Sequence, residues 1–346
     1  MRKGIVMTRI IGRGVYVPAR RTNEDFEEKY GKKAKAISRL INHEVHYLAT
    51  DIESREVNIS NVGMALNAAK QAIQNAKLAN EDIDLIIYST STPDYLLPPS
   101  YILLQKELKI KNCMGFDIRS GCAGFGTALT LADKYIKTGE CKNALVVGAD
   151  LISSRFTKFP AKELDMKTLF NYMFFGDCAG AVVLTGSDED RGIISTKVES
   201  TMADVDMGSA FYVGGALHPY PSEEVDSEKW AAYQATGLSE EYLSKVLIET
   251  FEEFQNESGV DLSEIDRFIM PIESEKIAKR VFERFPEITP DKICSNHSEG
   301  GALINAAIPV AINSAIENEK LKKNEKVLIY AAENTQWQHA IIFMKW

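Results

Sequence analysis

Apolar and polar residues divide the chain into two kinds of alternating segment. Short apolar runs such as ALVVGA at 144–149 and KVLIYAA at 326–332 are typical of strands buried on both faces. Between such runs, longer segments with apolar residues every three or four positions predict amphipathic helices. The alternation predicts an α/β fold. The expected strands are 5–11, 85–90, 113–117, 144–149, 180–185, 192–199, 267–271, 326–331 and 339–344, and the expected helices are 61–78, 100–108, 123–138, 241–257, 274–284 and 301–316.

An internal repeat, called the echo below, divides the chain into two similar parts. Asp84 and Asp266 each precede an apolar strand, and they are 182 residues apart; the same offset carries the strand at 144–147 onto 326–329. Two landmarks that share one offset indicate duplicated halves. We therefore expect an N-terminal half at 1–187 and a C-terminal half at 188–346. The segment 200–240 breaks the pattern and is predicted to be a loop or cap that forms a tunnel wall.

The composition narrows the classes of function. A formal net charge of −9 argues against a nucleic-acid partner, because phosphate binding needs a basic surface. Five scattered cysteines without a CxxC pair predict neither a disulfide framework nor a structural zinc. No apolar stretch reaches the length of about 18 residues that a membrane span needs, and the first residues lack the apolar core of a secretion signal. We therefore expect a cytoplasmic protein without a membrane partner.

The strongest local motif is DIRSGCAGFG at 117–126, where an apolar strand runs through a tight turn into a helix. Cys122 stands at the start of that helix, where unpaired backbone N–H groups and the helix dipole stabilise a thiolate. The same N–H groups can hold the oxyanion of an acyl-transfer intermediate. The spacing alone also fits a small cysteine packed at a helix start, so both interpretations stay open at this point.

Several segments in order give the chain a resemblance to a known family. These are RIIGRGVYVPARRTNEDFEEKYG, IIYSTSTPDYLLPPSYILLQKELKI, DIRSGCAGFGTALTLADKYIKTGECKNALVVGADLISS, FFGDCAGAVVL and QWQHAIIF. The chain resembles, nearly end to end, the β-ketoacyl-acyl-carrier-protein synthase III group of the thiolase-like condensing enzymes. The resemblance implies two duplicated halves in five α-β-α-β-α layers and, as a rule, a homodimer. It also implies that Cys122, in the N-terminal half, is the nucleophile that accepts the acyl group.

The resemblance fails where the family places a His and an Asn that promote decarboxylation of a malonyl thioester. An ungapped comparison puts Ile272 at the His position and Ala302 at the Asn position, and neither side chain can donate a hydrogen bond or move a proton. His297 and Glu333 are the candidate replacements, since both lie in loops that the echo brings to the active-site end of the second half. Asn334 and Glu299 are weaker candidates.

The expected partners follow from the same resemblance. Acyl-coenzyme A or acyl-carrier protein would be the thioester substrate, although no tryptophan stands where relatives stack the adenine of coenzyme A. Lys276, Arg280 and Arg284 form an i, i+4, i+8 stripe on one predicted helix, which is a candidate docking and substrate-binding patch; an ordinary solvated face is the alternative. We predict no cofactor and no metal, because His43 and His46 lack a third ligand nearby.

Two functions remain open from the sequence. The first is an acyltransferase that loads Cys122 from a thioester and passes the acyl group on, either by condensation to a 3-oxoacyl product or by O- or N-acyl transfer in a specialised pathway. The second is a non-catalytic partner subunit that forms a heterodimer with an active homologue, which the missing His and Asn suggest. The intact Cys122 motif favours the enzyme.

Overall fold

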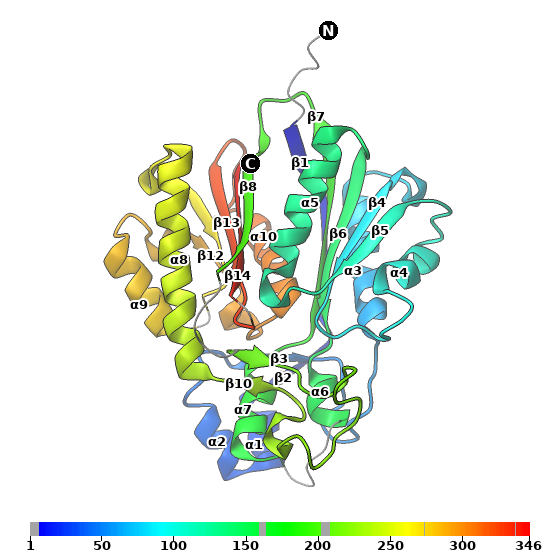
Figure 1. Cartoon of the computed structure of the whole chain (residues 1–346), viewed down its shortest axis with the longest axis vertical. Helices are drawn as coiled ribbons and strands as arrows, with labels where there is room; N and C mark the ends of the chain where they lie inside the picture. Colours follow the sequence, from blue (N-terminus) through cyan, green and yellow to red (C-terminus); the bar gives the residue numbers. More distant parts are fainter. Residues whose placement is uncertain (1–6, 159–163, 202–207, 273, 336) are drawn as a thin grey trace.

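The structure is a computed structural model that describes residues 7–158, 164–201, 208–272, 274–335 and 337–346. Ten strands are hydrogen-bonded in one continuous mixed order, β12-β11-β13-β14-β8-β1-β7-β6-β4-β5. The strands of the two halves form two β layers with helices between them (Figure 1). The halves of the sheet meet where β1 pairs with β8, through Thr8 and Ile193. The first half holds β1 (Met7–Tyr16), β4 (Leu85–Ser89), β5 (Met114–Ile118), β6 (Asn143–Asp150) and β7 (Cys178–Ser187). The second half holds β8 (Gly192–Ser200), β11 (Arg267–Ile269), β12 (Ile293–Cys294), β13 (Lys326–Ala332) and β14 (Gln338–Lys345).

Helices cover both halves of the sheet and fill the space between them. α5 (Gly124–Thr138) and α10 (Ala307–Glu317) lie in the middle and contact strands of both halves. α3 (Asn61–Asn75) and α4 (Ser100–Leu108) cover the outer face of the first half. On the outer face of the second half, α8 (Thr236–Ser258) packs beside α9 (Glu275–Arg284) (Figure 1). The resulting layers are α-β-α-β-α, which confirms the predicted fold class.

The echo in the sequence corresponds to a repeated set of hydrogen bonds. The Asp84 carboxylate accepts the backbone N–H groups of Lys142 and Asn143 at 2.9 and 3.0 Å, and thereby joins the start of β4 to the start of β6. In the second half, the Asp266 carboxylate accepts the N–H of Lys326 at 2.8 Å and joins β11 to β13 in the same way. The aspartates recur because each fixes the register of two neighbouring parallel strands.

Close packing explains the glycines at the beginning of the chain. α3 presents a stripe of buried alanines to β1, so the two backbones approach closely. A Cβ atom added at Gly12 would lie 2.1 Å from the carbonyl oxygen of Ala72, and one at Gly14 would lie 2.1 Å from that of Ala68. The GRG sequence therefore allows a helix to lie directly on a strand.

A smaller layer at one end of the sheet carries the rest of the described residues (Figure 1). Its centre is the buried Asp177 carboxylate, which accepts the N–H of Ala49 at 2.6 Å and that of Ser153 at 2.8 Å. Burial raises the pKa of Asp177 to about 6. The elements of this layer are β2 (Ala19–Thr22), α1 (Asn23–Tyr30), α2 (Lys32–Ile37), β3 (Val45–Leu48), α6 (Ser153–Lys158), α7 (Met166–Phe174), β9 (Ser209–Ala210) and β10 (Tyr233–Gln234).

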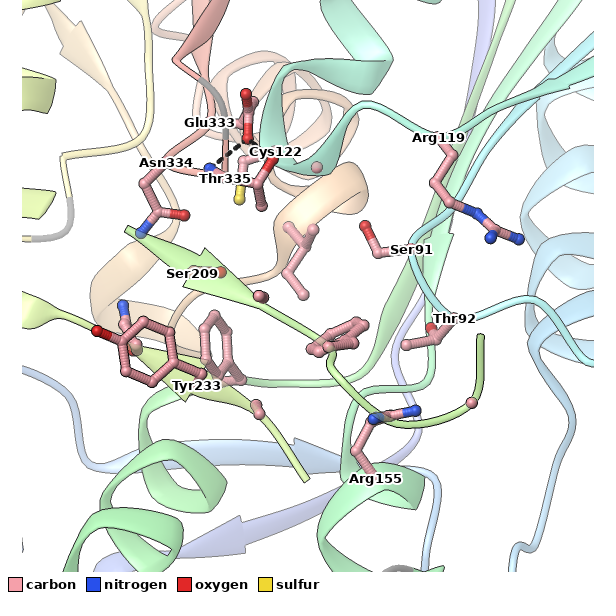
Figure 2. A pocket seen from close by; sticks show the side chains of 18 of the residues that line it. Ser91, Thr92, Arg119, Cys122, Arg155, Ser209, Tyr233, Glu333, Asn334 and Thr335 are labelled. Carbon is pink, nitrogen blue, oxygen red and sulfur yellow. Dashed lines mark hydrogen bonds between the residues drawn. The ribbon is translucent and has the colours of Figure 1, made fainter. Parts of the chain in front are cut away.

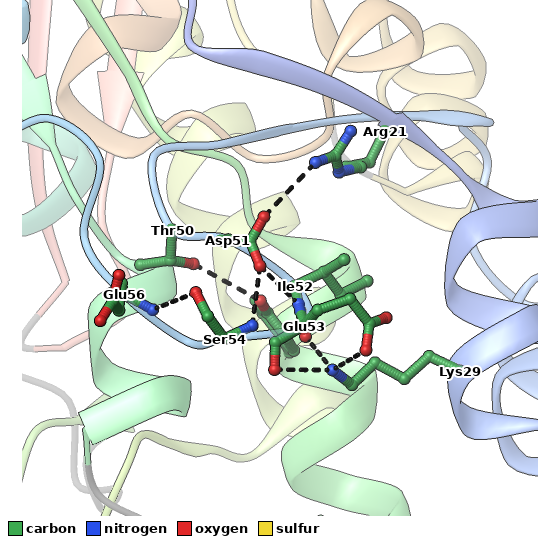
Figure 3. A network of polar contacts seen from close by, with 9 residues as sticks. Arg21, Lys29, Thr50, Asp51, Ile52, Glu53, Ser54 and Glu56 are labelled. Carbon is green, nitrogen blue, oxygen red and sulfur yellow. Dashed lines mark hydrogen bonds and ion pairs between the residues drawn. The ribbon is translucent and has the colours of Figure 1, made fainter.

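A polar network on the loop after β3 holds this layer together (Figure 3). The Asp51 carboxylate accepts the N–H groups of Glu53 and Ser54 at 2.9 and 2.7 Å, and it pairs with Arg21 of β2 at 3.9 Å. The Thr50 hydroxyl donates to Ser153 at 2.9 Å, which connects the loop to α6 and thus to Asp177. The loop and the helix are therefore fixed relative to each other near the functional end of the sheet.

The structure differs from the sequence-based expectations in three places. The predicted helix at 301–316 begins only at Ala307, because Gly301 has a φ of +73° and residues Ile304–Ala306 form a separate 3-10 turn. The segment 200–240 contains the β9–β10 pair and the start of α8, and residues 202–207 lie outside the described residues. The sequence did not predict the helices of the smaller layer. No described helix has the combination of length and apolar character that crossing a membrane would require.

The contact between β6 and the turn before α10 gives a test of this packing. A Cβ atom at Gly148 would lie 2.0 Å from the carbonyl oxygen of Asn305, so Gly148→Ala should force the two halves apart and lower the free energy of unfolding by about 1–3 kcal/mol. Chemical denaturation measures this loss. Gly215→Ala is the control because nothing lies within 4 Å of its added Cβ. Equal stability of the two variants would contradict the close approach.

Candidate active site

A cavity of about 700 Å³ lies between the two halves at the ends of the strands. Residues 91–96 after β4 and the turn at 119–122 line it from the first half, and residues 332–335 after β13 line it from the second. Residues 209–215 and 232–234 close another side, so this part of the 200–240 segment does form a cavity wall. The volume is typical of a small-molecule site.

Cys122 is placed on this cavity by a tight turn in front of α5 (Figure 2). Residues Gly121–Ala123 form a 3-10 turn, in which Gly121 has a φ of +47° that a side chain would disfavour. At Gly124, an added Cβ would lie 2.1 Å from the Ser89 hydroxyl and 2.5 Å from the Asn305 side-chain oxygen. The glycines therefore let the helix start press against the second half while the sulfur stays at the cavity.

The other four cysteines lie in environments that disfavour a thiolate. Burial raises the pKa of Cys113 and Cys294, and it raises that of Cys141 to about 11. The pKa of the fully buried Cys178 is also raised by burial. None of these four lines the cavity, so Cys122 is the cysteine available for chemistry there.

Glu333 and Asn334 reach the cavity in the loop between β13 and β14, beside the Cys122 turn (Figure 2). Glu333 is only 3% exposed, and a Cβ atom at Gly121 would lie 3.2 Å from its Oε2. Its carboxylate accepts the Thr335 hydroxyl, and its Oε1 accepts the N–H of Gln338 at 2.8 Å. Asn334 donates its Nδ2 to the Ser239 hydroxyl at 3.0 Å. The loop therefore holds a carboxylate against the turn that carries Cys122.

The structure does not bring His297 to the cavity. The ring is buried between His43 and Phe174, with centroid distances of 5.3 and 5.7 Å, and it is absent from the cavity lining. Burial lowers the pKa of His297 to about 4 and that of His46, which packs on His43, to about 3. The Phe175–Ala302 bridge holds the residues that follow this loop against the end of α7. The predicted role of His297 as a base at Cys122 therefore has no geometric support.

The family positions for His and Asn are apolar in the structure as well. Ile272 packs in the hydrophobic cluster of the second half, and Ala302 is 2% exposed beside Phe175. No histidine is among the described residues that line the cavity. Glu299 is exposed and does not line the cavity either.

The stripe Lys276, Arg280 and Arg284 runs along α9 where it faces α8. Lys276 pairs with Glu240 at 2.9 Å, Arg280 donates to the Ser244 hydroxyl at 2.8 Å, and Arg284 pairs with Glu252. All three side chains are exposed, but acidic residues of α8 offset much of their charge. Carrier docking at this stripe stays a prediction.

The sequence did not predict several of the residues that line the cavity. Ser91, Thr92, Arg119 and Arg155 lie on the side of the cavity that the first half supplies (Figure 2). Arg155 holds the cavity wall by donating from Nε to the carbonyl of Ala231 at 2.9 Å. The offset of 182 read from the sequence carries Cys122 onto Ile304, which also lines the cavity.

Comparisons with known proteins agree with this geometry. The family pattern described as 3-oxoacyl-[acyl-carrier-protein (ACP)] synthase III matches residues 116–201, and its C-terminal counterpart matches residues 256–341. The β-ketoacyl-[acyl-carrier-protein] synthase III of Clostridium perfringens is 30% identical over 324 residues, which cover 93% of this chain and 94% of that protein.

Two solved structures extend the likeness to three dimensions. The 3-oxoacyl-[acyl-carrier-protein] synthase III of Aquifex aeolicus has a TM-score of 0.79 at 28% identity, over 98% of this chain and all of that one. AbyA1, described as a tetronic acid condensing enzyme, shares the fold with a TM-score of 0.85 at 22% identity, over 98% of this chain and 100% of that one.

The chain belongs to the 3-oxoacyl-[acyl-carrier-protein] synthase III family. Membership confirms the resemblance drawn from the sequence and makes the protein an enzyme of the acyltransferase class. Within this synthase III framework, Cys122 lies on a cavity, whereas Ile272 and Ala302, the residues expected at the family's His and Asn positions, are apolar.

The difference among the cysteines predicts selective modification. Iodoacetamide at neutral pH should label Cys122 first, because the thiolate is the reactive form and burial raises the pKa of the other four thiols. Peptide mass spectrometry at short times measures the order, and the Cys122→Ser variant should lose the fast label. If the partly exposed Cys113 reacted as fast, Cys122 would not be the accessible thiol.

The buried histidines predict a loss of stability in acid. His297 stays neutral in the folded protein down to about pH 4, whereas in the unfolded chain it takes up a proton below about 6.5. Protonation therefore favours the unfolded chain. As far as His297 is concerned, the free energy of unfolding has its full value above pH 6.5 and falls by at most about 3 kcal/mol as the pH falls toward 4. Urea unfolding across this range should show a shallower fall for His297→Phe. His218→Gln, at a partly exposed histidine, serves as the control, and an unchanged slope in His297→Phe would contradict the assignment.

Proposed function

We propose that the protein takes an acyl group from a thioester onto Cys122 and transfers it to a second substrate. The observation that carries the proposal is the position of Cys122 at the head of α5, on a cavity and beside the Glu333 carboxylate. The names of its relatives point to acyl-carrier protein as a partner, and acyl-coenzyme A is the alternative donor.

In the first step, the Cys122 sulfur attacks the carbonyl carbon of the donor thioester. A new sulfur–carbon bond forms, the donor carbon–sulfur bond breaks, and the donor leaves as a thiol that takes up the proton. The N–H groups of Ala123 and Gly124 already donate to backbone carbonyls of the turn, so a donor to the negative oxygen of the intermediate would come from another backbone N–H at the cavity. In the second step, an incoming nucleophile replaces Cys122 on the acyl carbon, and the sulfur regains a proton.

For the second substrate we favour an amine or a hydroxyl compound over a malonyl thioester. Glu333 lies against the Cys122 turn, where a carboxylate can take the proton of a nucleophile but would repel the carboxylate of a malonyl group. The described cavity lining contains no histidine that could donate to the thioester carbonyl during decarboxylation. Condensation to a 3-oxoacyl product therefore becomes the second candidate.

The alternative hypothesis, that the protein is a non-catalytic partner subunit, has less support. A subunit kept for structure alone would not need its cysteine on a cavity of this size. The expected homodimer stays a prediction, and the mass of the purified protein in solution distinguishes it from a heterodimer. A homodimer that acylates itself would contradict the partner-subunit reading.

Replacement of Glu333 should separate the acylation of Cys122 from the transfer of the acyl group. Glu333→Gln should still form the acyl-enzyme on Cys122, whereas transfer to an amine or alcohol should slow by about 100-fold or more, because a general base is lost. Intact-protein mass spectrometry measures the adduct after addition of acyl-carrier protein and its decay after addition of butylamine or butanol. Glu299→Gln is the matched control, since Glu299 is exposed and away from the cavity.

Two outcomes would contradict the proposal. An adduct that persists in Cys122→Ala would place the acyl group elsewhere. Release of carbon dioxide from a malonyl thioester at the rate of acyl-enzyme decay would show condensation and reject the preference for amines and alcohols.

A further inference from the structure

A second cavity, of about 400 Å³, lies beside the free edge of β1. β1 pairs with β7 along its length but with β8 only at its beginning, so its later residues have no strand on one side. There the Gln71 side-chain oxygen accepts the N–H of Val15 at 3.3 Å. Asn75 donates its Nδ2 to the carbonyl of Arg13 at 2.7 Å. Side chains of α3 thus take the place of a neighbouring strand, and α10 and the loop before it line the opposite side of the cavity.

Two nitrogen donors on this cavity lack a partner. Asn296 lines the cavity and is 2% exposed, and no described group accepts a hydrogen bond from its Nδ2. Arg13 also lines it and is half-buried, and its Nε, which is shielded from solvent, has no acceptor among the described residues. A buried donor without an acceptor is costly, so a ligand that brings oxygen atoms to these two groups gains free energy.

The charged residues favour a ligand that carries both charges. Arg13 is the one basic residue among the described residues of the lining, and a carboxylate can accept from a guanidinium and an amide together. Glu299 and Glu317 also line the cavity, and both are exposed at its rim. Burial and the Glu299 carboxylate raise the pKa of Tyr47, another lining residue, so this negative charge acts inside the cavity. Two glutamates would repel a simple anion, whereas an added ammonium group would be attracted to them.

An apolar patch selects the rest of the ligand. Leu303 is 1% exposed and belongs to a small hydrophobic cluster, against which Val15, Tyr47 and Val310 pack. These three are only partly buried, and all four residues line the cavity. An alkyl group on the ligand would cover the patch and gain free energy for each methylene that it buries.

We infer that the cavity beside β1 binds a free α-amino acid with an aliphatic side chain. The carboxylate of the ligand accepts hydrogen bonds from Arg13 and Asn296. Its ammonium group faces the glutamates at the rim, and its alkyl group lies on the patch at Leu303. The inference goes beyond the proposed function and does not depend on it, because the described residues that line this cavity differ from all those that line the Cys122 cavity.

The test is calorimetric titration of the full chain with L-leucine, L-isoleucine, L-valine and L-methionine, which should show one saturable site. Two analogues of leucine test the charges separately. The first, 4-methylpentanoate, lacks the ammonium group, and 3-methylbutylamine lacks the carboxylate. Each should bind at least about tenfold more weakly than L-leucine, because one charged contact is lost.

Three variants test the residues. Arg13→Met and Asn296→Leu should each weaken the binding of L-leucine by about 10–100-fold, the range for loss of a hydrogen bond to a charged group. Glu317→Gln, at an exposed position, should weaken L-leucine but not 4-methylpentanoate, and it replaces the buried variants if they do not fold. Arg39→Met is the matched control, because Arg39 is exposed and does not line the cavity. It should leave the affinity unchanged.

Three results would overturn the inference. The first is the absence of saturable binding by all four amino acids. The second is equal binding of 4-methylpentanoate and L-leucine, which would show that the ammonium group is not recognised. The third is binding of L-leucine that Arg13→Met and Glu317→Gln leave unchanged, which would place the amino acid elsewhere on the protein.

Discussion

The contact between the ends of β4 and β6 and the turn Ile304–Ala306 before α10 is the constraint on which the rest of the structure depends. The Asp150 carboxylate accepts both the backbone N–H of Asn305, at 3.1 Å, and its side-chain Nδ2, at 2.8 Å, while Asn305 accepts the Ser89 hydroxyl. All of these groups are fully buried, and burial raises the pKa of Asp150. A bond of this kind across two halves tolerates little movement, because a separated polar group would be left without a partner. The Cys122 turn is therefore fixed against the second half before any substrate binds.

This junction also decides where chemistry can occur. Because the helix starts meet closely, the loops that follow the strands must spread around them, and the cavity lies in the space that they enclose. The first half contributes Cys122, whereas the second contributes the loop at 332–335. A change in the second half can thus alter the reaction without disturbing the position of Cys122. Ile272 and Ala302, which the sequence comparison places at the family's His and Asn positions, both lie in the second half.

The sequence predicted the parts of the molecule that obey a local rule. Continuous apolar runs gave the central strands, and the repeated aspartates gave the pseudo-symmetry, because both follow from hydrogen bonding within a parallel sheet. The site of Cys122 followed from a strand, a glycine turn and a helix start. His297 shows the limit: the offset places its loop near the Cys122 turn, but the turn that corresponds to Gly121–Ala123 is Ile304–Ala306, and His297 is buried in the separate turn His297–Glu299. Contacts between distant loops, such as Glu333 against Gly121, leave no periodic signal.

The neighbourhood of Cys122 and Glu333 constrains the order of events. Two negative charges on adjacent turns in a cavity would repel each other, since little water separates them. In the proposed reaction, the acylated sulfur is neutral, and the Glu333 carboxylate, held by Thr335 and Gln338, lies beside the turn that carries the electrophilic carbon. Under the proposed function, Glu333 would therefore act after acylation, as a base for the incoming nucleophile.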